Sequence, residues 1–390
     1  MQAVFLCGGA AADMYPIDQD VSLLQFLGQT LLQHHIDQAV AAGVEAVVVV
    51  AAGPGAGRAE EVARGHSRVR VAAAEGPSAW ADALRGARPF LGGEVVLVDA
   101  GCILAPSAYD ELRARAQKGQ APCSLVGRTD DGSSAACALL HPDGASLLEA
   151  LEAVAGPEAN AMAGLAQRGH GGERVPCDGC YGPIARPWHV LGAMERILDG
   201  CHRAIAPSAQ VSERATVEGS VVLAEGVRVF EGAVIRGPCY IGARSVVGNG
   251  ALVRDHCHIG SDCVVGFATE VARSYVGDGC LFHRNYIGDS VIADRCSFGA
   301  GTVTANLRFD EGTVKVRGGG QATDSGLDKL GAMIGPGCKT GINASIMPGV
   351  RIGRGSIVGP HVLLAHDLEP YSSILLDTRG SFQVKRRESP

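Results

Sequence analysis

The chain has 390 residues, a formal net charge of −7, and 46% hydrophobic but only 5% aromatic residues. This composition is typical of a globular protein with room for two cores, and the acidic balance argues against nucleic acid as a partner. The longest apolar run, residues 46–52, is far shorter than the ~20 residues that span a bilayer, and no basic residue precedes Arg58 to start a secretory signal, so we expect a cytoplasmic protein without a membrane partner.

The first half alternates apolar runs with helical patterns. Three β-branched runs predict buried strands: residues 3–7, 45–52 and 94–101. Residues 31–43 carry a helical pattern between the first two runs. Buried strands that alternate with helices and glycine turns favour a parallel, doubly wound sheet. A turn and a helix over residues 182–200 close this half, and we place the domain boundary near Cys201.

The second half repeats every six residues. Twelve consecutive positions at this spacing are aliphatic, from Ile205 to Val271, and a small or slender side chain follows nearly all of them by four residues. A helix has a period near 3.6 and a flat sheet a period of 2, whereas a period of six is typical of a parallel β-helix. The phase slips by one residue at Val276, resumes at Ile292, and is interrupted by an expected extended loop at residues 304–333.

The repeat also explains six of the 13 cysteines. These six occupy the small position of the repeat and are predicted to pack in the core: Cys239, Cys257, Cys263, Cys280, Cys296 and Cys338. The pair Cys177 and Cys180 has no second pair at zinc-ligand spacing, so we expect reduced thiols and no metal site. His256 and His258 beside two of the cysteines have the residue types of a metal cluster, but the alternating faces of a strand favour packing.

The first strand is followed by the loop LCGGAAADMYP, then by the helix SLLQFLGQTLLQHHIDQAVAAGV, and later by the hexapeptides. This order of segments resembles that of the archaeal-type bifunctional sugar-1-phosphate nucleotidylyltransferases that carry an acetyltransferase domain. The resemblance implies a doubly wound, Rossmann-like α/β nucleotidyltransferase domain at residues 1–200. It implies a left-handed parallel β-helix acyltransferase domain at residues 201–370, with the inserted loop at 304–333, and a C-terminal tail at residues 371–390. It also implies a homotrimer built through the β-helix.

The first loop departs from the family pattern, which reads roughly L-A-x-G-x-G-T-R-M-x-P and is followed by a lysine and a proline. Residues 11–13 are Ala-Ala-Asp where the family has Gly, Thr and Arg, and residues 21–22 are Val-Ser where it has Lys and Pro. Cys102 matches a metal-binding aspartate of the family, with Asp99 nearby as an alternative ligand. Nucleotidyl transfer needs cations to stabilise moving negative charge, so we predict that this activity is lost and that Mg²⁺ is not used.

The second half keeps three family motifs. The stretch LFHRNYIGDS contains H-x-N-Y-x-G-D-[SA], and the resemblance makes His283 the base that deprotonates the amino sugar, with Asn285 and Tyr286 shaping the pocket. The stretch GAGTVTANLRFD implies a substrate contact for Asn306 and a place beside the pantetheine arm for Ala300. The third motif, KLGAMIGPGCKTGINASIMPGV, and the coil after it imply further contacts with the coenzyme: Lys339, Ile342 and Pro360.

The phosphate of the acceptor needs cations. Arg254 matches the family's phosphate-clamping arginine, whereas the lysine expected at Ala272 is absent, and Arg273 is an imperfect substitute because the two cations differ in geometry. The chain has 29 arginines and only five lysines, yet three of the lysines lie around the interrupted repeat. We therefore assign Lys315 and Lys329 to substrate binding, with solvated loop charges as the alternative.

These observations predict an acetyl-CoA-dependent N-acetyltransferase that acts on an amino-sugar 1-phosphate in nucleotide-sugar biosynthesis, with acetyl-CoA as co-substrate. Two alternatives stay open. In one, the protein is not catalytic: its first domain binds a nucleotide sugar and its solenoid assembles subunits. In the other, it is an active sugar-1-phosphate nucleotidylyltransferase. The intact His283 and Asn306 favour the acetyltransferase, and the uncharged first loop disfavours the nucleotidylyltransferase.

Overall fold

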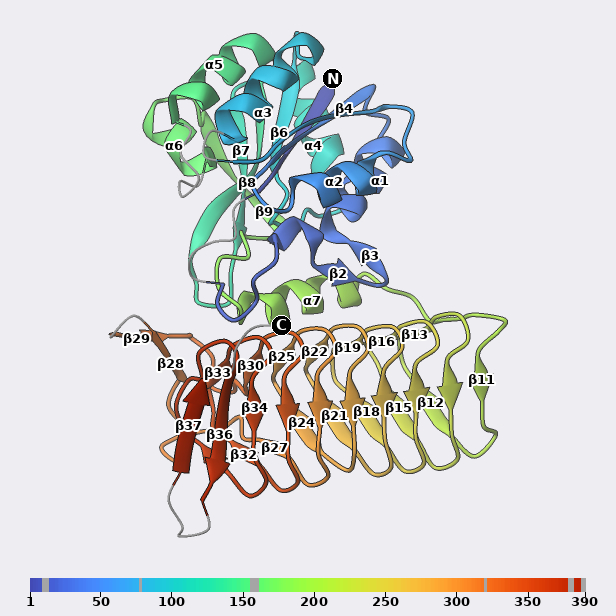
Figure 1. The fold of residues 1–390 in the computed structure, drawn as a ribbon. Coiled ribbons are helices and arrows are strands. Elements are labelled where there is room, and N and C mark those ends of the chain that lie inside the picture. Colours follow the sequence, from blue (N-terminus) through green and yellow to red (C-terminus); the bar gives the residue numbers. More distant parts are fainter. Residues whose placement is uncertain (9–13, 77–78, 155–160, 319–320, 378–381, 387–390) are drawn as a thin grey trace. The chain divides into compact units, whose positions relative to one another are not determined.

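The structure is a computed structural model that describes residues 1–8, 14–76, 79–154, 161–318, 321–377 and 382–386. The chain forms two compact units (Figure 1). The first unit comprises Met1–Asp13, Gln19–Gln25 and Gln29–Ala185, and the second comprises Met14–Asp18, Phe26–Gly28 and Arg186–Pro390. Two short segments from the start of the chain are therefore part of the second unit.

A seven-stranded sheet with the order β5-β4-β1-β6-β8-β7-β9 forms the centre of the first unit. The bounds of its strands are β1 (Gln2–Cys7), β4 (Ala46–Ala52), β5 (Val69–Ala74), β6 (Val95–Asp99), β7 (Cys123–Arg128), β8 (Ser134–His141) and β9 (Glu173–Tyr181). The first four are parallel, whereas β8 is antiparallel to both of its neighbours. The sheet is therefore doubly wound about β1 but mixed, not wholly parallel as the alternation of strands and helices suggested.

Helices cover both faces of this sheet. Their bounds are α1 (Leu31–Ala41), α2 (Ala56–Ala63), α3 (Ala79–Ala87), α4 (Ala108–Gln117), α5 (Gly144–Val154) and α6 (Ala161–Gln167). Ala3 and Phe5 of β1 pack with residues of α1, α2 and α4, while Val4 and Leu6 pack with residues of α3, α5 and α6. Strands buried on both faces need continuous apolar runs, which is why these runs could be predicted. Within the described residues, no helix is both long and apolar enough to cross a bilayer.

Helix α1 begins at Leu31, so the helix expected from Ser22 onward is corrected. The residues before it include the two-stranded ribbon β2 (Gln25–Phe26) and β3 (Gln29–Thr30). Gly28 at the turn of this ribbon has a φ of 77°, in the left-handed region that interrupts an α-helix. The apolar residues of this segment have helical spacing, but they flank a tight turn instead.

Cys177 and Cys180 form a disulfide, which corrects the expectation that all thiols are reduced. Gly179 between them has a φ of 87°, and the turn it allows leaves the two Cα atoms 5.4 Å apart. The other 11 cysteines are free. The six that were assigned to the repeat are all buried in the core of the second unit, which confirms their packing role.

Most of the second unit is α7 (His189–Asp199) followed by a left-handed parallel β-helix, whose short strands stack into three faces. The first face contains β10 (Ala204–Ile205), β13 (Val221–Leu223), β16 (Cys239–Ile241), β19 (Cys257–Ile259), β22 (Tyr275–Val276), β25 (Val291–Ile292), β30 (Met333–Ile334) and β33 (Arg351–Ile352). The second face contains β11 (Gln210–Val211), β14 (Arg228–Val229), β17 (Val246–Val247), β20 (Val264–Val265), β23 (Leu281–Phe282), β26 (Ser297–Phe298), β31 (Lys339–Thr340) and β34 (Ile357–Val358). The third face contains β12 (Thr216–Glu218), β15 (Val234–Arg236), β18 (Leu252–Arg254), β21 (Glu270–Ala272), β24 (Tyr286–Gly288), β27 (Val303–Thr304), β32 (Ser345–Ile346) and β35 (Leu363–Leu364).

The core of the solenoid is built from the aliphatic positions of the six-residue repeat. Val253 and Val271, for example, pair across adjacent coils and are both fully buried. On the second face, Phe282 and Phe298 pair in the same way, and the centroids of their stacked rings are 4.9 Å apart. The first coil is the exception, because no earlier coil covers it: Ile205 is 41% exposed, and Val211 and Val217 are only partly buried. The hexapeptide pattern therefore predicted the core correctly from the second coil onward.

The interruption and the C-terminus both differ from expectation. The interruption carries an antiparallel hairpin, β28 (Lys315–Gly318) and β29 (Gln321–Asp324), rather than only an extended loop. The expected C-terminal tail contains a second hairpin, β36 (Ser372–Leu376) and β37 (Phe382–Arg386), and β36 pairs in parallel with β34. Ile374 of β36 packs in the core. A solenoid needs such a cap, because its last coil would otherwise expose its interior.

Candidate active site

One corner of the solenoid, where the second face turns into the third, gathers predicted residues from successive coils. We call it the donor corner, and it comprises the residues that follow β23, β26, β31 and β34: His283, Ala300, Ile342 and Pro360. The Asn343 N–H donates to the Ala300 carbonyl and the His361 N–H donates to the Ile342 carbonyl, both at 2.9 Å. These bonds join each turn to the next, so residues far apart in the sequence form one column.

His283 has an exposed side chain on a backbone that its neighbours hold in place. Asn285, which is 4% exposed, accepts a hydrogen bond from the His283 N–H at 2.5 Å. The Asn285 amide group also donates to the carbonyls of Gly299, at 2.8 Å, and Thr302, at 3.1 Å. Both polar atoms of the Asn285 side chain are occupied by these hydrogen bonds. Asn285 therefore orients the turn of His283 and does not present a polar group to the surface.

Polar side chains gather at the opposite edge of the third face. Asn306 donates from Nδ2 to the Tyr286 hydroxyl at 3.2 Å and to the Asp289 carboxylate. Asp289 is 5% exposed, and it also accepts two hydrogen bonds from Arg273, at 2.7 and 2.9 Å. With the charged residues on the neighbouring coil, these side chains form what we call the acceptor cluster: Arg254, Asp255, Glu270, Arg273, Tyr286, Asp289 and Asn306.

Both arginines of the acceptor cluster are already paired. Arg254 donates to one carboxylate oxygen of Glu270, at 2.9 and 2.6 Å, and to Asp255. Burial lowers the pKa of Arg254, but the hydrogen bonds to the two carboxylates outweigh it, so the pKa rises. The hydrogen bonds to Asp289 raise the pKa of Arg273 in the same way. Two guanidinium groups face three carboxylates, which leaves the cluster with one net negative charge.

The predicted lysines lie in different places. Lys329 borders the acceptor cluster, because the next residue, Leu330, donates its N–H to the Asn306 carbonyl at 2.9 Å. Lys339 is exposed in β31, on the second face beside the donor corner. Lys315 is exposed in hairpin strand β28, and none of the contacts among the described residues joins it to the cluster.

The sequence analysis missed three carboxylates of the cluster, Asp255, Glu270 and Asp289. Asp289 is the aspartate of the H-x-N-Y-x-G-D motif, so the motif itself marked it. Glu270 lies 16 residues after Arg254, which is close to one coil of the repeat and therefore predicts vertical neighbours. Coil spacing was the signal that could have identified this pair.

In the first unit, the family positions that the structure describes are apolar or buried. Residues 11–13 lie outside the described residues. Val21 is buried, and Cys102 is completely buried, which raises the pKa of its thiol well above the ordinary value. Cys102 is therefore neutral at physiological pH and is a poor counterpart of a metal-binding carboxylate. Arg58 is exposed on α2 and forms no ion pair with any described residue.

Two carboxylates, Asp20 and Asp99, lie in this part of the first unit. Burial raises the pKa of Asp99 to about 6, although a hydrogen bond from the Gly101 N–H at 2.8 Å opposes the shift. Burial also raises the pKa of Asp20, which accepts hydrogen bonds from the Ser22 N–H and hydroxyl. Among the described residues, no group of three or more ligating side chains could hold a metal ion. We assign no metal-dependent step to this unit.

We expect no nucleotidyl transfer by the full-length protein. Pyrophosphate release should stay at the level of a protein-free blank with UTP or dTTP, a sugar 1-phosphate and Mg²⁺. The physical reason is that Cys102 is neutral and no cation pairs with Asp20 or Asp99 among the described residues, whereas the transition state needs positive charge. Pyrophosphate release clearly above the blank would show that this expectation is wrong.

The hexapeptide pattern of the second half also matches known proteins. The family model described as bacterial transferase hexapeptide, six repeats, matches residues 331–366. The bifunctional protein GlmU of Methanococcus maripaludis strain C7 is 50% identical over 46 residues, which are 12% of this chain and 11% of the relative. Because of this local similarity, we call the β-helix of the second unit the GlmU-like domain.

Other matches to the GlmU-like domain are equally local. The bifunctional protein GlmU of Methanococcus aeolicus is 41% identical over 59 residues, or 15% of this chain and 14% of the relative. The chain thus matches less than a sixth of the length of these relatives. A crystal structure of UDP-N-acetylglucosamine acyltransferase aligns with 44% of this chain and 70% of its own, at 18% identity and a TM-score of 0.32.

Proposed function

We propose that the GlmU-like domain transfers the acetyl group of acetyl-CoA to the amino group of an amino-sugar 1-phosphate, of the glucosamine or galactosamine type. This step belongs to nucleotide-sugar biosynthesis, and we propose that the nucleotidyl transfer of the bifunctional family is lost here. The arrangement of β24 supports the proposal, because His283 precedes this strand at the donor corner and Asp289 follows it in the acceptor cluster. The strand has three residues, or about 10 Å, so one sugar can reach both.

The reaction forms one C–N bond and breaks one C–S bond. The amine must lose a proton, because an ammonium group has no lone pair with which to attack the thioester carbonyl. His283 takes this proton, since imidazole is the side chain that most often acts as a general base at neutral pH. Coenzyme A leaves as a thiolate and is protonated in turn. Asn285 contributes by fixing the backbone from which the imidazole projects.

The acceptor cluster would bind the sugar. Asn306 and Tyr286 offer an amide and a hydroxyl for the sugar hydroxyl groups, while Arg254, Arg273 and Lys329 supply positive charge for the phosphate. The arginines are compensated by carboxylates, so phosphate must compete with Glu270 for Arg254. A phosphate can displace a carboxylate from a guanidinium group, because the guanidinium group donates hydrogen bonds to either anion.

We expect Glu270→Gln to lower the KM for the amino-sugar 1-phosphate about threefold to tenfold, with little change in kcat. The substitution removes one negative charge next to Arg254 and leaves that guanidinium freer for phosphate. Steady-state kinetics with glucosamine 1-phosphate would measure the effect. Asp262→Asn is a matched control, since Asp262 pairs with Arg244 outside the acceptor cluster at 2.7 and 2.5 Å. An increased KM for Glu270→Gln alone would contradict the competition between Glu270 and phosphate.

The decisive experiment measures thiol release from acetyl-CoA with glucosamine 1-phosphate and with galactosamine 1-phosphate. We expect turnover with one or both acceptors and none with the corresponding N-acetylated sugars, which lack a free amine. Pyrophosphate release is followed in parallel with UTP and dTTP. If neither acceptor is acetylated while nucleotide sugars bind, the proposal fails and the non-catalytic binding protein takes its place.

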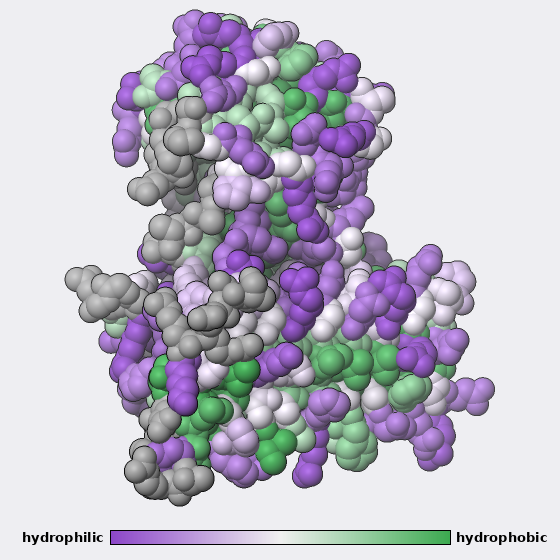
Figure 2. Space-filling model, in the orientation of Figure 1, coloured by the Kyte–Doolittle hydropathy of each residue, from purple (hydrophilic) through white to green (hydrophobic). Residues whose placement is uncertain are grey.

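We also propose that the protein is a homotrimer built through the solenoid. Large apolar side chains remain exposed along it: Phe267, Leu281, Val303, Ile342 and Leu363. Figure 2 shows apolar surface, in green, along the side of the solenoid drawn there. Apolar faces of this kind are typical of interaction surfaces. Light scattering at micromolar concentration should give three times the mass of one chain, whereas a monomer under these conditions would contradict the proposal.

A further inference from the structure

The disulfide between Cys177 and Cys180 closes a bulge in an edge strand. Strand β9 lies at the end of the sheet and pairs with β7. Val126 and Arg128 of β7 pair with Pro176 and Tyr181 of β9, so a single β7 residue lies opposite residues 177–180. These four residues leave the ladder as a bulge, and the disulfide joins its two ends. Bulges in edge strands are exposed positions at which proteins present functional groups.

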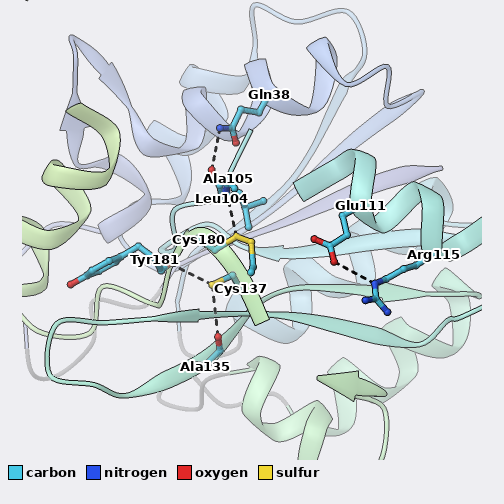
Figure 3. The surroundings of a disulfide bond; sticks show 10 residues. Gln38, Leu104, Ala105, Glu111, Arg115, Ala135, Cys137, Cys180 and Tyr181 are labelled. Carbon is cyan, nitrogen blue, oxygen red and sulfur yellow. Dashed lines mark hydrogen bonds and ion pairs between the residues drawn. A yellow bond between two sulfur atoms is a disulfide. The ribbon is translucent and has the colours of Figure 1, made fainter. Parts of the chain in front are cut away.

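The strand after the bulge is held by bonds that do not involve the disulfide. Tyr181 exchanges two backbone hydrogen bonds with Ile103, at 2.9 and 3.1 Å, and its hydroxyl donates to Asp130 at 2.8 Å. Cys137, beside Tyr181 in Figure 3, donates to the Tyr181 carbonyl at 3.4 Å. A disulfide that closes so short a loop restricts the unfolded chain little. Opening the disulfide therefore leaves the fold of this unit in place.

The two cysteines differ in exposure. Cys177 is half-buried at the surface, whereas Cys180 is only 3% exposed. The Sγ atom of Cys180 accepts a hydrogen bond from the Ala105 N–H at 3.4 Å (Figure 3). A backbone N–H that points at sulfur favours the thiolate over the thiol. An incoming thiolate can thus reach Cys177, and the Ala105 N–H stabilises the negative charge that develops on Cys180 when the S–S bond breaks.

We propose that Cys177 and Cys180 form a thiol–disulfide exchange site for a low-molecular-weight thiol such as glutathione. A thiolate of the small molecule attacks the Sγ atom of Cys177, a new S–S bond forms, and the bond to Cys180 breaks with its electron pair on Cys180. A second small thiolate then attacks the mixed disulfide and releases the Cys177 thiolate. In total, the protein disulfide and two thiols give a protein dithiol and one small-molecule disulfide. The proposal does not depend on acetyl transfer.

The test uses the native full-length protein and glutathione at several ratios of its reduced to its oxidised form. Free thiols are trapped by alkylation after acid quenching, and peptide mass spectrometry then reports the state of each cysteine. We expect Cys177 and Cys180 to open and close together without denaturant, and to reach the same ratio from either direction. Cys201, the half-buried free cysteine, serves as the internal control and should stay reduced.

Two variants test the order of attack. Cys180→Ser leaves the accessible sulfur without its partner, so we expect it to hold one glutathione as a stable mixed disulfide. Cys177→Ser leaves only the buried sulfur, and we expect at least about tenfold less adduct under the same conditions. Circular dichroism and thermal unfolding confirm that both variants are folded.

Three outcomes would overturn the proposal. The first is a protein in which the two cysteines are never linked, and the second is a disulfide that opens only after unfolding. The third is equal adduct formation in both folded variants, since it would show that exposure does not select the sulfur that is attacked. The glutathione titration needs no variant, so it tests the exchange reaction even if one variant fails to fold.

Discussion

Replacement of His283 by alanine should reduce kcat for acetyl transfer about 10²–10⁴-fold, the usual contribution of a general base. Its side chain is exposed at the donor corner, and its backbone is held by Asn285, so the substitution removes the imidazole without removing a core contact. The oligomeric state and the affinity for acetyl-CoA should therefore stay close to those of the wild type. Thiol release at saturating substrate measures kcat, and calorimetry measures the binding of acetyl-CoA.

The pH dependence separates a base from a merely structural residue. As the pH rises, more of the amino sugar is present as free amine and no base is needed to deprotonate it. The rate of His283→Ala should therefore increase with pH and approach that of the wild type. His202→Ala is a control, because His202 is exposed and precedes the first coil of the solenoid. Wild-type turnover of His283→Ala at neutral pH would rule out the base, and a loss that is constant with pH would point to a structural role.

Substitution of Asp289 by asparagine should raise the KM for the amino-sugar 1-phosphate about tenfold to a hundredfold, with a smaller effect on kcat. Asp289 is almost fully buried and holds both Arg273 and Asn306. An amide has one acceptor oxygen instead of two, so it cannot receive the paired bonds of the guanidinium group and the Asn306 bond as well. Arg273 would then keep only its 3.4 Å hydrogen bond to Asp255, so its guanidinium group should move away from its present position.

The comparison with Glu270→Gln distinguishes a positioning role of Asp289 from an effect of its negative charge. Both substitutions remove one negative charge from the acceptor cluster, so a purely electrostatic effect would lower both KM values. Glu270 holds only Arg254, whereas Asp289 orients two side chains, so we expect the KM to change in opposite directions. Asp262→Asn again serves as control for the loss of a paired carboxylate. A KM that falls in both variants would show that Asp289 contributes charge alone and would refute its positioning role.

The six-residue period by itself determined the second half of this protein. Each coil places the same kind of side chain inside, so an aliphatic residue at every sixth position and a cysteine in the small slot are sufficient to specify a solenoid and its core. The apolar runs at β1, β4 and β6 were equally informative, because strands covered on both faces must be apolar throughout. The H-x-N-Y-x-G-D motif also located the exposed turn of His283.

Only the tertiary structure decided which charges meet. Arg254 and Glu270, or Arg273 and Asp289, are each 16 residues apart and become neighbours because one coil stacks on the next. The C-terminal residues form the hairpin of β36 and β37 because the last coil would otherwise have an open end. A local sequence pattern does not show that this end needs to be covered. Local periodicity reports which face of a strand is buried, whereas ion pairs, caps and disulfides form between segments that are brought together only when the whole chain has folded.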